Sequence, residues 1–326
     1  MRILVVGGAG YIGSHVVKEL LNQGIDVRVY DNLSTGQRVN LFKKAEFVEG
    51  DILDVPTLEN AMEGVDGVVH LAAKKAVGES MEKPDMYALN NLNGTVNVLN
   101  AMVKKGVKYF VFSSTAAVYG MPDKSLLDEE TPLNPINFYG FSKKMIEDVL
   151  AWYDRLKGIK FVALRYFNAV GYDAEGDVPG MEKNPQNLLP IVMETIFGVR
   201  KEMTVFGSDY PTKDGTCVRD YIHVSDLASA HYLALKHLSQ KDSSLILNLG
   251  TGTGHSVKEM IDETERVTGR KVNYKMGERR AGDPAALMAF SQKANEILGW
   301  VPRHSSLENI IKTTYALYKR KLGKKG

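Results

Sequence analysis

The sequence predicts an α/β fold, in which a doubly wound parallel sheet precedes a smaller mixed α/β domain. Three observations predict it. Strand-like and helix-like segments alternate from residue 2 to residue 166, a glycine-rich turn joins the first strand to the first helix, and the alternation breaks after residue 168. We therefore expect one domain over residues 1–168 and a second over 169–326, with residues 225–250 returning to the first.

The first half contains six short runs rich in β-branched and aromatic residues, which are typical of buried strands. They are expected at 2–8, 27–31, 45–51, 66–73, 108–114 and 160–166. Between them, apolar residues at helical spacing predict helices at 15–24, 56–63, 86–105 and 139–157. Strands that alternate with helices form right-handed βαβ units, so the predicted sheet is parallel and covered on both faces.

The second half of the chain shows no regular alternation of strand-like and helix-like segments. Residues 168–185 are rich in Gly, Asp and Pro, which suits loops that line a cleft. Helical and strand-like pieces then follow irregularly at 188–198, 203–207, 224–235, 246–250 and 257–269. We interpret them as a domain packed on the carboxyl ends of the large sheet.

Composition excludes several classes of function. A formal net charge of +2 gives no overall field for nucleic acid or membrane, and the basic run at 319–326 is expected to be a solvated tail. Cys217 has no partner for an internal disulfide, and no Cys/His cluster has metal-ligand spacing, so no metal is expected. Without a signal peptide or a membrane-spanning run, the protein is expected to be cytoplasmic.

The stretch GGAGYIGSH contains Gly7, Gly10 and Gly13 between the first strand and the first helix. Glycines allow a tight turn and a close approach of backbone to a pyrophosphate, which also meets the positive end of the helix dipole. A plain tight turn is the alternative, but the strand before and the helix after favour a dinucleotide site of the Rossmann type.

Three more polar residues are candidates for contacts with that dinucleotide. Asp31 ends the second strand about twenty residues past the glycines, where a carboxylate binds ribose hydroxyls and repels a 2′-phosphate. NAD is therefore expected rather than NADP, although Arg28 and Arg38 lie nearby in sequence. Asp51 is expected near the adenine, or as a helix cap. Lys75 is expected near a phosphate or a ribose.

The reactive groups are expected where the fifth strand ends and the next helix begins. Ser113, Ser114 and Thr115 place hydroxyls at the carboxyl end of the strand, where ligands bind such sheets. Tyr139 and Lys143 share one helix face, and an ammonium favours the phenolate that would act as a base. Capping roles for the hydroxyls and the tyrosine, and a surface role for the lysine, are the alternatives.

Several longer motifs occur in order along the chain: GGAGYIGSH, DNLSTG, KAVGES, SSTAAVYG, YGFSK, LRYFNAVG, FGSDYPTKDGTCVRDYIHV and RRAGDP. Together they resemble the UDP-galactose 4-epimerases, an extended branch of the short-chain dehydrogenase/reductase superfamily. The resemblance extends from Arg2 to about Trp300. It implies bound NAD and a UDP-hexose substrate, and a homodimer formed through helices 86–105 and 139–157.

The resemblance also implies positions for both ligands. NAD contacts are expected from Gly7, Gly10, Tyr11, Ile12, Gly13, Asp31, Asn32, Leu33, Ser34, Thr35, Gly36, Asp51, Ile52, Leu71, Ala72, Ala73, Lys75, Asn90, Ser113, Tyr139, Lys143 and Phe167. Substrate contacts are expected from Thr115, Tyr139, Asn168, Asn187, Leu188, Thr204, Val205, Phe206, Arg219, Arg280, Asp283 and Leu287.

The implied reaction inverts C4 of the sugar. Tyr139 takes the proton of the 4-hydroxyl while Thr115 bonds to the same oxygen, and hydride leaves C4 and returns on the opposite face. A nucleotide-sugar 4,6-dehydratase is the nearest rival, but Ala116 and Ala117 stand where its acid and base are usual. A non-catalytic NAD sensor is the rival from another class.

One departure from the family pattern concerns the sugar end of the pocket. Leu287 stands where some relatives carry a tyrosine that closes this end. Leucine is smaller and cannot donate a hydrogen bond. We therefore expect space for a 2-acetamido group and turnover of UDP-N-acetyl sugars.

Overall fold

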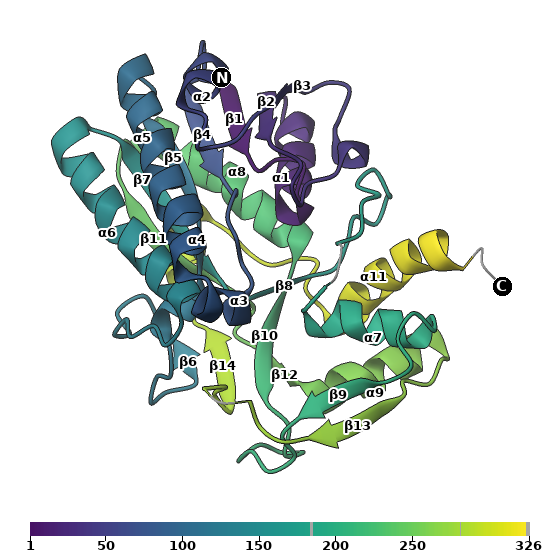
Figure 1. Cartoon of the computed structure of the whole chain (residues 1–326). Helices are drawn as coiled ribbons and strands as arrows, with labels where there is room; N and C mark the ends of the chain where they lie inside the picture. The colour runs from purple at the N-terminus through teal and green to yellow at the C-terminus, as the bar shows by residue number, and fades with distance from the viewer. Residues whose placement is uncertain (183–184, 281, 324–326) are drawn as a thin grey trace.

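The computed structural model describes residues 1–182, 185–280 and 282–323. A seven-stranded sheet, parallel throughout, dominates the first half of the chain, as the sequence predicts (Figure 1). Its strands, in spatial order, are β11 (Leu245–Leu249), β7 (Lys160–Tyr166), β5 (Tyr109–Thr115), β4 (Gly67–His70), β1 (Arg2–Val6), β2 (Asp26–Asp31) and β3 (Glu46–Glu49). The order reverses between β1 and β4, so their carboxyl ends flank the crevice in which such sheets bind ligands.

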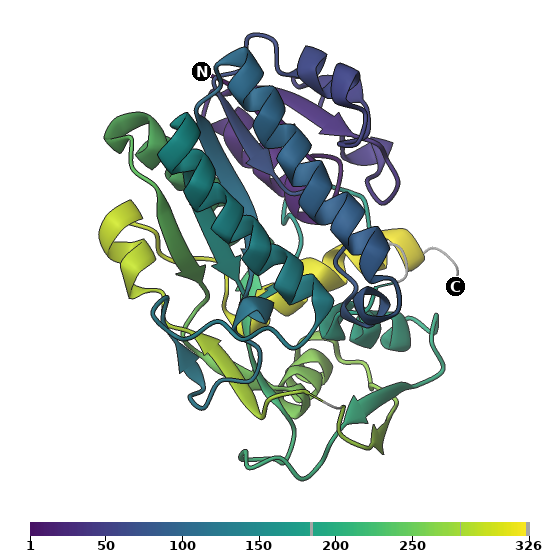
Figure 2. The ribbon, with the colours of Figure 1, turned by 60° about the vertical axis from the view of Figure 1, so that its left-hand side comes forward.

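Helices cover both faces of this sheet because each strand is apolar on both sides. On one face, α1 (Tyr11–Asn22) packs against α8 (Val224–Lys241). On the other, α2 (Val55–Ala61), α5 (Gly94–Lys105) and α6 (Phe138–Lys157) enclose a second buried cluster of apolar side chains. Figure 2 shows α5 and α6 lying side by side across that face.

The helix predicted at 86–105 is interrupted. It consists of α4 (Pro84–Tyr87), a π-helical segment Ala88–Asn93 and then α5. The π-helical segment carries Asn91, whose buried amide bonds to the backbone of Lys74 beyond the end of β4. Such wide turns are rare and often occur beside functional sites.

The second half forms two smaller sheets. β12 (Gly254–Ser256), β10 (Val218–His223), β14 (Ala286–Ala289) and β6 (Leu126–Leu127) lie in that order, and β8 (Asn168–Val170) also pairs with β10. The other sheet contains β9 (Met203–Phe206) and β13 (Tyr274–Gly277). Around them are α7 (Leu188–Ile196), α9 (Val257–Thr268) and α11 (Leu307–Leu322), which share a third apolar core.

The chain crosses between the two halves in both directions. Residues 224–249 form α8 and β11, and both lie on the large sheet. In the opposite direction, β6 belongs to the first half of the sequence but pairs with β14 in the smaller sheet. Three short elements, α3 (Val77–Glu82), η3 (Ala116–Tyr119) and α10 (Gln292–Leu298), complete the parts that surround the site.

None of the helices in the described part of the chain combines the length and apolarity needed to cross a membrane. Within the same residues, no group of three or more His, Cys, Asp or Glu side chains is placed to hold a metal ion. Cys217 is buried and unbonded to sulfur.

Candidate active site

The glycine turn is packed too tightly for any side chain at two of its positions. Gly7 has φ +86°, and a Cβ there would lie 2.6 Å from the backbone nitrogen of Ala72. A Cβ on Gly13 would lie 2.1 Å from the carbonyl oxygen of Gly7. Gly10 is the N-cap of α1 and brings no side chain to its free N–H groups. Backbone donors and the helix dipole therefore meet at this end of the sheet, as a pyrophosphate requires.

Tyr11 and Ile12 direct their side chains away from the turn. The hydroxyl of Tyr11 donates to the carbonyl of Gly171, and its ring lies 5.0 Å from the ring of Tyr172. Ile12 packs against the core beneath α1. Both residues are only partly buried, at the start of α1 beside the turn.

Asp31 joins the glycine turn to the loop after β2. Its carboxylate accepts hydrogen bonds from the backbone of Ala9 (3.0 Å) and Leu33 (2.8 Å). A Cβ on Gly36 would lie 2.7 Å from the same carboxylate, so Ser34, Thr35 and Gly36 curl closely around it. Burial raises the pKa of Asp31, and the two backbone donors oppose this shift.

Asp51 lies beside that loop but does not cap the next helix. Asn32 donates to its carboxylate over 2.7 Å, and the backbone of Leu53 donates over 2.9 Å. The N-cap of α2 is Asp54, which bonds to the backbone of Thr57. Ile52 packs into the core beside Asp51. The alternative interpretation of Asp51 as the helix cap is therefore wrong.

The two arginines near Asp31 in sequence are both engaged elsewhere. Arg28 is buried, donates to the carbonyls of Ala61 (2.7 Å) and Glu63 (2.9 Å), and pairs with Glu46. Arg38 pairs with Glu49. Arg28 cannot receive a 2′-phosphate from this position, so the possibility that it softens the preference for NAD is not supported.

Two buried polar residues that the sequence did not single out hold the loop after β4. The backbone nitrogens of Leu71 and Ala72 both donate to the carbonyl of Val6. Next to Ala73, the backbone of Lys74 is bonded at both its N–H (2.9 Å) and its C=O (3.0 Å) by the side chain of Asn91. Asn90, which was expected to contact NAD, donates to Asn91. The second of the two buried polar residues is Ser80. Its hydroxyl oxygen accepts a hydrogen bond from the backbone N–H of Tyr139 over 3.1 Å.

Lys75 extends from the same loop and pairs with Glu182. Glu182 lies in the segment that crosses from β8 towards α7. This ion pair links the two halves of the molecule beside the predicted dinucleotide site. Asn91 could have been found from its polar side chain on an otherwise apolar helical face, and Ser80 from its place as the last residue of the KAVGES motif.

Tyr139, Lys143 and Thr115 are brought together at the carboxyl end of β5. Asn137 caps α6 through a 2.8 Å bond to the backbone of Gly140, which starts the helix just before Tyr139. The ammonium of Lys143 donates to the carbonyl of Ser113 over 2.7 Å and lies 6.0 Å from the ring centroid of Tyr139. The side chain of Thr115 lies close enough to the hydroxyl of Tyr139 to lower the pKa of that phenol.

Of the three hydroxyls at this strand end, that of Thr115 lies beside Tyr139, and the other two bond elsewhere. The hydroxyl of Ser113 bonds to that of Tyr166, and Ser114 donates to Glu147. Thr115 also accepts from the backbone of Ala117, so its predicted capping role and its contact with Tyr139 hold together.

Burial has opposite effects on the two titrating groups. It raises the pKa of the Tyr139 phenol above 10, and the side chain of Thr115 opposes that rise. It lowers the pKa of Lys143 to about 7, opposed by the charge of Glu147. The net direction for the phenol is therefore upward, because desolvation of Tyr139 outweighs the effect of Thr115.

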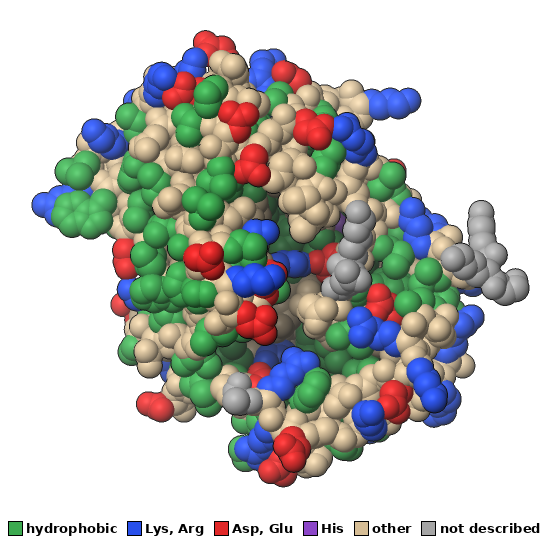
Figure 3. Space-filling view, viewed as in Figure 1, with side chains coloured by type: hydrophobic (Ala, Val, Ile, Leu, Met, Phe, Trp, Pro, Cys, Tyr) green, Lys and Arg blue, Asp and Glu red, His purple; other side chains and the backbone are tan. Residues whose placement is uncertain are grey.

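The arginines predicted to hold the nucleotide sugar lie in the smaller sheets. Arg219 on β10 forms an ion pair with Asp283. The guanidinium of Arg280 stacks 4.0 Å from the ring centroid of Phe206, at the end of β9 after Thr204 and Val205. Figure 3 shows the surface hollowed between the large sheet's half and these smaller sheets, with basic and acidic side chains around the opening.

The remaining predicted substrate contacts come from several different elements. Leu287 lies opposite Arg219 in the ladder of β10 and β14, and it packs against the apolar cluster that contains Phe167 and Ala116. Asn168 donates to the carbonyl of Asp220 over 3.1 Å. Asn187 is the N-cap residue of α7 and Leu188 its first residue.

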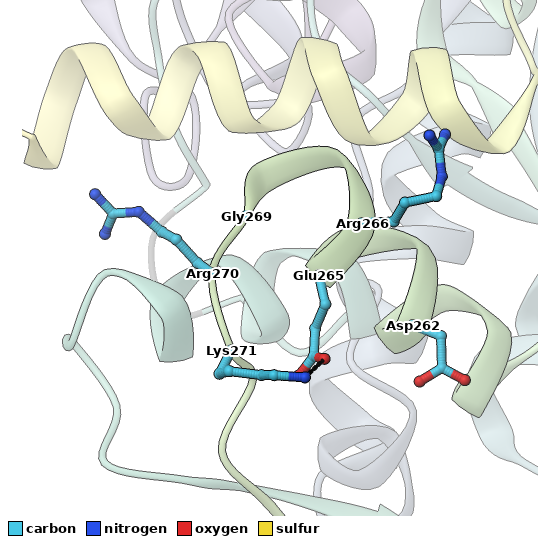
Figure 4. A pocket seen from close by; sticks show the side chains of 6 residues that line it. All are labelled: Asp262, Glu265, Arg266, Gly269, Arg270 and Lys271. Carbon is cyan, nitrogen blue, oxygen red and sulfur yellow. Dashed lines mark hydrogen bonds and ion pairs between the residues drawn. The ribbon is translucent and has the colours of Figure 1, made fainter.

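A second hollow lies elsewhere, at the carboxyl end of α9 (Figure 4). Asp262, Glu265, Arg266, Gly269, Arg270 and Lys271 line it, and Lys271 pairs with Glu265 across 2.6 Å. It is lined by two acidic and three basic side chains, and none of the residues predicted for the reaction lies in it.

Comparison with known proteins agrees with this geometry. The NAD dependent epimerase/dehydratase family matches residues 3–250. A UDP-glucose 4-epimerase of Lactobacillus helveticus is 46% identical over 98% of this chain and 97% of its own length. The UDP-glucose 4-epimerase of Brucella ovis in complex with NAD has a TM-score of 0.95 at 45% identity, covering 97% of this chain and 98% of that one.

The name of a third similar protein includes an N-acetyl sugar. The UDP-Glc/GlcNAc 4-epimerase of Campylobacter jejuni has a TM-score of 0.86 at 38% identity, covering 98% of this chain and 99% of that one. Full-length matches at these identities leave no large segment without a counterpart. The chain therefore belongs to the NAD dependent epimerase/dehydratase family and, within it, to the UDP-glucose 4-epimerases.

Proposed function

We propose that the protein interconverts UDP-glucose and UDP-galactose by inverting C4 through a 4-keto sugar, with bound NAD. The observation that carries this proposal is the contact of Tyr139 with Thr115 at the end of β5, with Lys143 held against Ser113 in the same place. The glycine turn follows β1, which is separated from β5 by β4 alone in the same sheet, and this suits a cofactor that extends from the turn to the same carbon.

The residues around the crevice fit a dinucleotide. The turn of Gly7, Gly10 and Gly13 would hold the pyrophosphate, and Asp31 would hold the adenosine ribose. Lys143 and the loop that includes Lys75 would lie towards the nicotinamide. When bound by these residues, the cofactor would supply the acceptor for the hydride of C4 in its oxidised form and the donor of that hydride in its reduced form. Because the cofactor is restored in every cycle, tight retention costs no turnover.

The chain's own groups then move the proton and hold the substrate. Tyr139 as phenolate takes the proton of the 4-hydroxyl and later gives it back, while Thr115 donates a hydrogen bond to the same oxygen. The ammonium of Lys143 stabilises the phenolate. Arg219 and Arg280 hold the diphosphate, so the keto sugar can turn over without leaving. Ala116 and Ala117 supply no second acid or base, which disfavours a dehydratase.

The test uses UDP-galactose without added NAD and measures the UDP-glucose formed. Tyr139→Phe should reduce turnover by about a hundredfold or more, because it removes the acid/base hydroxyl. Tyr153→Phe is the matched control, since that hydroxyl bonds to Asn100 on the exposed side of the same helix. Nearly unaltered turnover in Tyr139→Phe would contradict the mechanism. Retained NAD with no turnover in the wild type would favour an NAD sensor.

We further propose that the pocket accepts a 2-acetamido group at C2. Leu287, partly buried on β14 opposite Arg219, supports this because it leaves more room than a tyrosine. Leu287→Tyr should then reduce turnover of UDP-N-acetylglucosamine far more than that of UDP-glucose. Absence of turnover of the N-acetyl sugar by the wild type would contradict the proposal.

We also propose a homodimer that assembles through α5 and α6, in the cytoplasm. Ile146 and Leu150 on α6 are buried within the subunit and are therefore not available to an interface. Other large apolar side chains remain exposed on these helices and just before them: Leu89, Val103, Phe141, Trp152 and Leu156. A second copy of the chain would cover them. Cys217 as the one cysteine of the chain is compatible with a reducing compartment.

A further inference from the structure

Three successive residues of β5 contact three successive turns of α6. The side chain of Thr115 lies close to the hydroxyl of Tyr139, the carbonyl of Ser113 accepts from Lys143, and Ser114 donates to Glu147 over 2.5 Å. Tyr139, Lys143 and Glu147 are four residues apart, so they share one helix face. Glu147 thus occupies the third place on the face that carries the two reacting groups.

Glu147 is buried together with an arginine. Its side chain is 3% exposed, and that of Arg165 on β7 is 4% exposed. Arg165 holds both carboxylate oxygens, with Nη2 2.6 Å from Oε2 and Nε 3.0 Å from Oε1. Desolvation makes a buried ion pair a weak source of stability, and apolar residues of similar volume often serve as well. Stability alone therefore does not explain why this ion pair lies beside the reacting groups, and a role in the reaction would explain it.

Arg165 is itself fixed in place. Its Nη1 donates to the hydroxyl of Tyr119 over 3.0 Å, and that hydroxyl donates to Asn248 over 2.7 Å. Asn248 lies on β11, so the network spans η3, β7 and β11. Glu147 is thereby fixed from one side by Arg165 and from the other by Ser114, and its charge stays at a constant position relative to Lys143.

Resting on the proposed function, we infer that Glu147 is a positioning residue for the reaction. It docks the helix face of Tyr139 and Lys143 on the end of β5, and its carboxylate keeps the buried Lys143 protonated. Nothing in the reaction requires Glu147 to touch the substrate or the cofactor. Its effect passes through Lys143.

The surroundings of Lys143 support this assignment. Four titratable groups interact with Tyr139 or Lys143 from several elements: Glu147 on α6, His70 on β4, Tyr166 on β7 and Tyr87 on α4. Arg165 on β7 and Glu79 on α3 lie behind them, bonded to Glu147 and Tyr87. Burial lowers the pKa of His70 to about 3, so this ring is neutral. Burial raises the pKa of both tyrosines, so they are neutral too. Glu147 remains as the carboxylate that raises the pKa of Lys143 against desolvation.

The first experiment is Glu147→Gln, which keeps the shape and an acceptor for Ser114 but removes the charge. Lys143 should then lose its proton at a pH lower by about one unit. Two readouts report this: the alkaline limb of turnover against pH, and the ¹³C chemical shift of the Lys143 side chain titrated by NMR. The NMR titration does not depend on the protein being an epimerase, so failure of the inference and failure of the proposed function are distinguishable.

Two further variants keep the experiment decisive. Should Glu147→Gln fail to fold because Arg165 is left unpaired, the double variant with Arg165→Met removes both charges, and Lys143 should still titrate below its wild-type pH. Asp148→Asn is the matched control, because Asp148 is exposed on the same helix and pairs only with Lys144 at the surface. Titration of Lys143 at the wild-type pH in every folded Glu147 variant overturns the inference.

Discussion

Thr115 is the residue whose hydroxyl decides how readily Tyr139 becomes a phenolate. Its side chain lowers the pKa of Tyr139 against the rise that burial causes. Thr115→Val removes that hydroxyl at constant shape, so the phenol's pKa rises and the acid limb of turnover should move to higher pH. At neutral pH the loss is expected to be about tenfold or more. The measurement is turnover of UDP-galactose from pH 5 upward.

Thr115→Ser is the control for that substitution, because it keeps the hydroxyl and loses only a methyl group. Its acid limb should remain near that of the wild type. An acid limb that is the same in Thr115→Val as in the wild type would show that the contact does not govern the base.

Lys143 carries a stability cost that depends on pH. Its pKa is about 7 in the folded chain, against an ordinary value of 10.5. Between these values the unfolded chain holds a proton that the folded chain lacks, so this group makes stability rise with pH, by at most about 1.4 kcal/mol per unit. Below pH 7 the cost is constant.

Lys143→Met removes this titration while filling similar space. The variant should be more stable than the wild type at pH 6, and the difference should shrink as pH rises towards 10.5. Denaturant unfolding at matched NAD content, repeated across this range, measures the difference. A difference that does not vary with pH would mean that Lys143 is not desolvated as described. The same variant should lose turnover, because residues that serve activity often lower stability, a relation known as the stability–activity trade-off.

At the scale of elements, the strand–turn–helix unit around Gly7 is expected to tolerate an added side chain poorly. Gly7→Ala places a Cβ 2.6 Å from the backbone nitrogen of Ala72, in a backbone conformation that already disfavours a side chain. Gly24→Ala is the matched control: its φ is +73°, but nothing lies within 4 Å of the added carbon.

The control should therefore cost only about 1 kcal/mol of strain, whereas Gly7→Ala should cost more and should release NAD. Thermal unfolding and the nucleotide content of the purified protein measure the two effects. If both variants retain NAD equally, the turn is not the pyrophosphate site. In that case the dinucleotide would have to bind by other residues.

Helices and strands could be predicted from the sequence where the local pattern of apolar and turn residues determines them. The six strands and the helix starting near Tyr139 follow from apolar period and flanking turn residues. The π-helical segment at Ala88–Asn93 and the cap at Asp54 were not predicted, because each depends on a contact with a neighbouring backbone group. Asn91 is an example. The helical pattern of its own segment does not indicate that its side chain bonds to the backbone of Lys74.

At the scale of the whole molecule, the exposed apolar face of α5 and α6 predicts the assembly. Figure 3 shows hydrophobic side chains gathered over these helices, and Trp152 is 57% exposed. Trp152→Glu places a charge on this face and should convert the dimer to a monomer, because an unpaired charge is costly in a buried interface. Sedimentation velocity measures the change.

Val199→Glu is the control for the assembly, since Val199 is equally exposed beyond α7 in the other half. That variant should sediment like the wild type. A wild-type chain that sediments as a monomer at micromolar concentration would contradict the dimer directly. A dimer that survives Trp152→Glu would place its interface elsewhere.

The sequence by itself determined the parallel sheet, the glycine turn and the pair Tyr139 and Lys143, because each depends on residues close together in the chain. The family resemblance assigned Thr115 to the reaction beside Tyr139, and only the tertiary structure gave the partners of the other two hydroxyls, since Ser113 bonds to Tyr166 and Ser114 to Glu147 on other elements. The tertiary structure also directed Arg28 away from Asp31 and buried Glu147 with Arg165. Those outcomes depend on desolvation and on contacts between distant segments, which no local pattern contains.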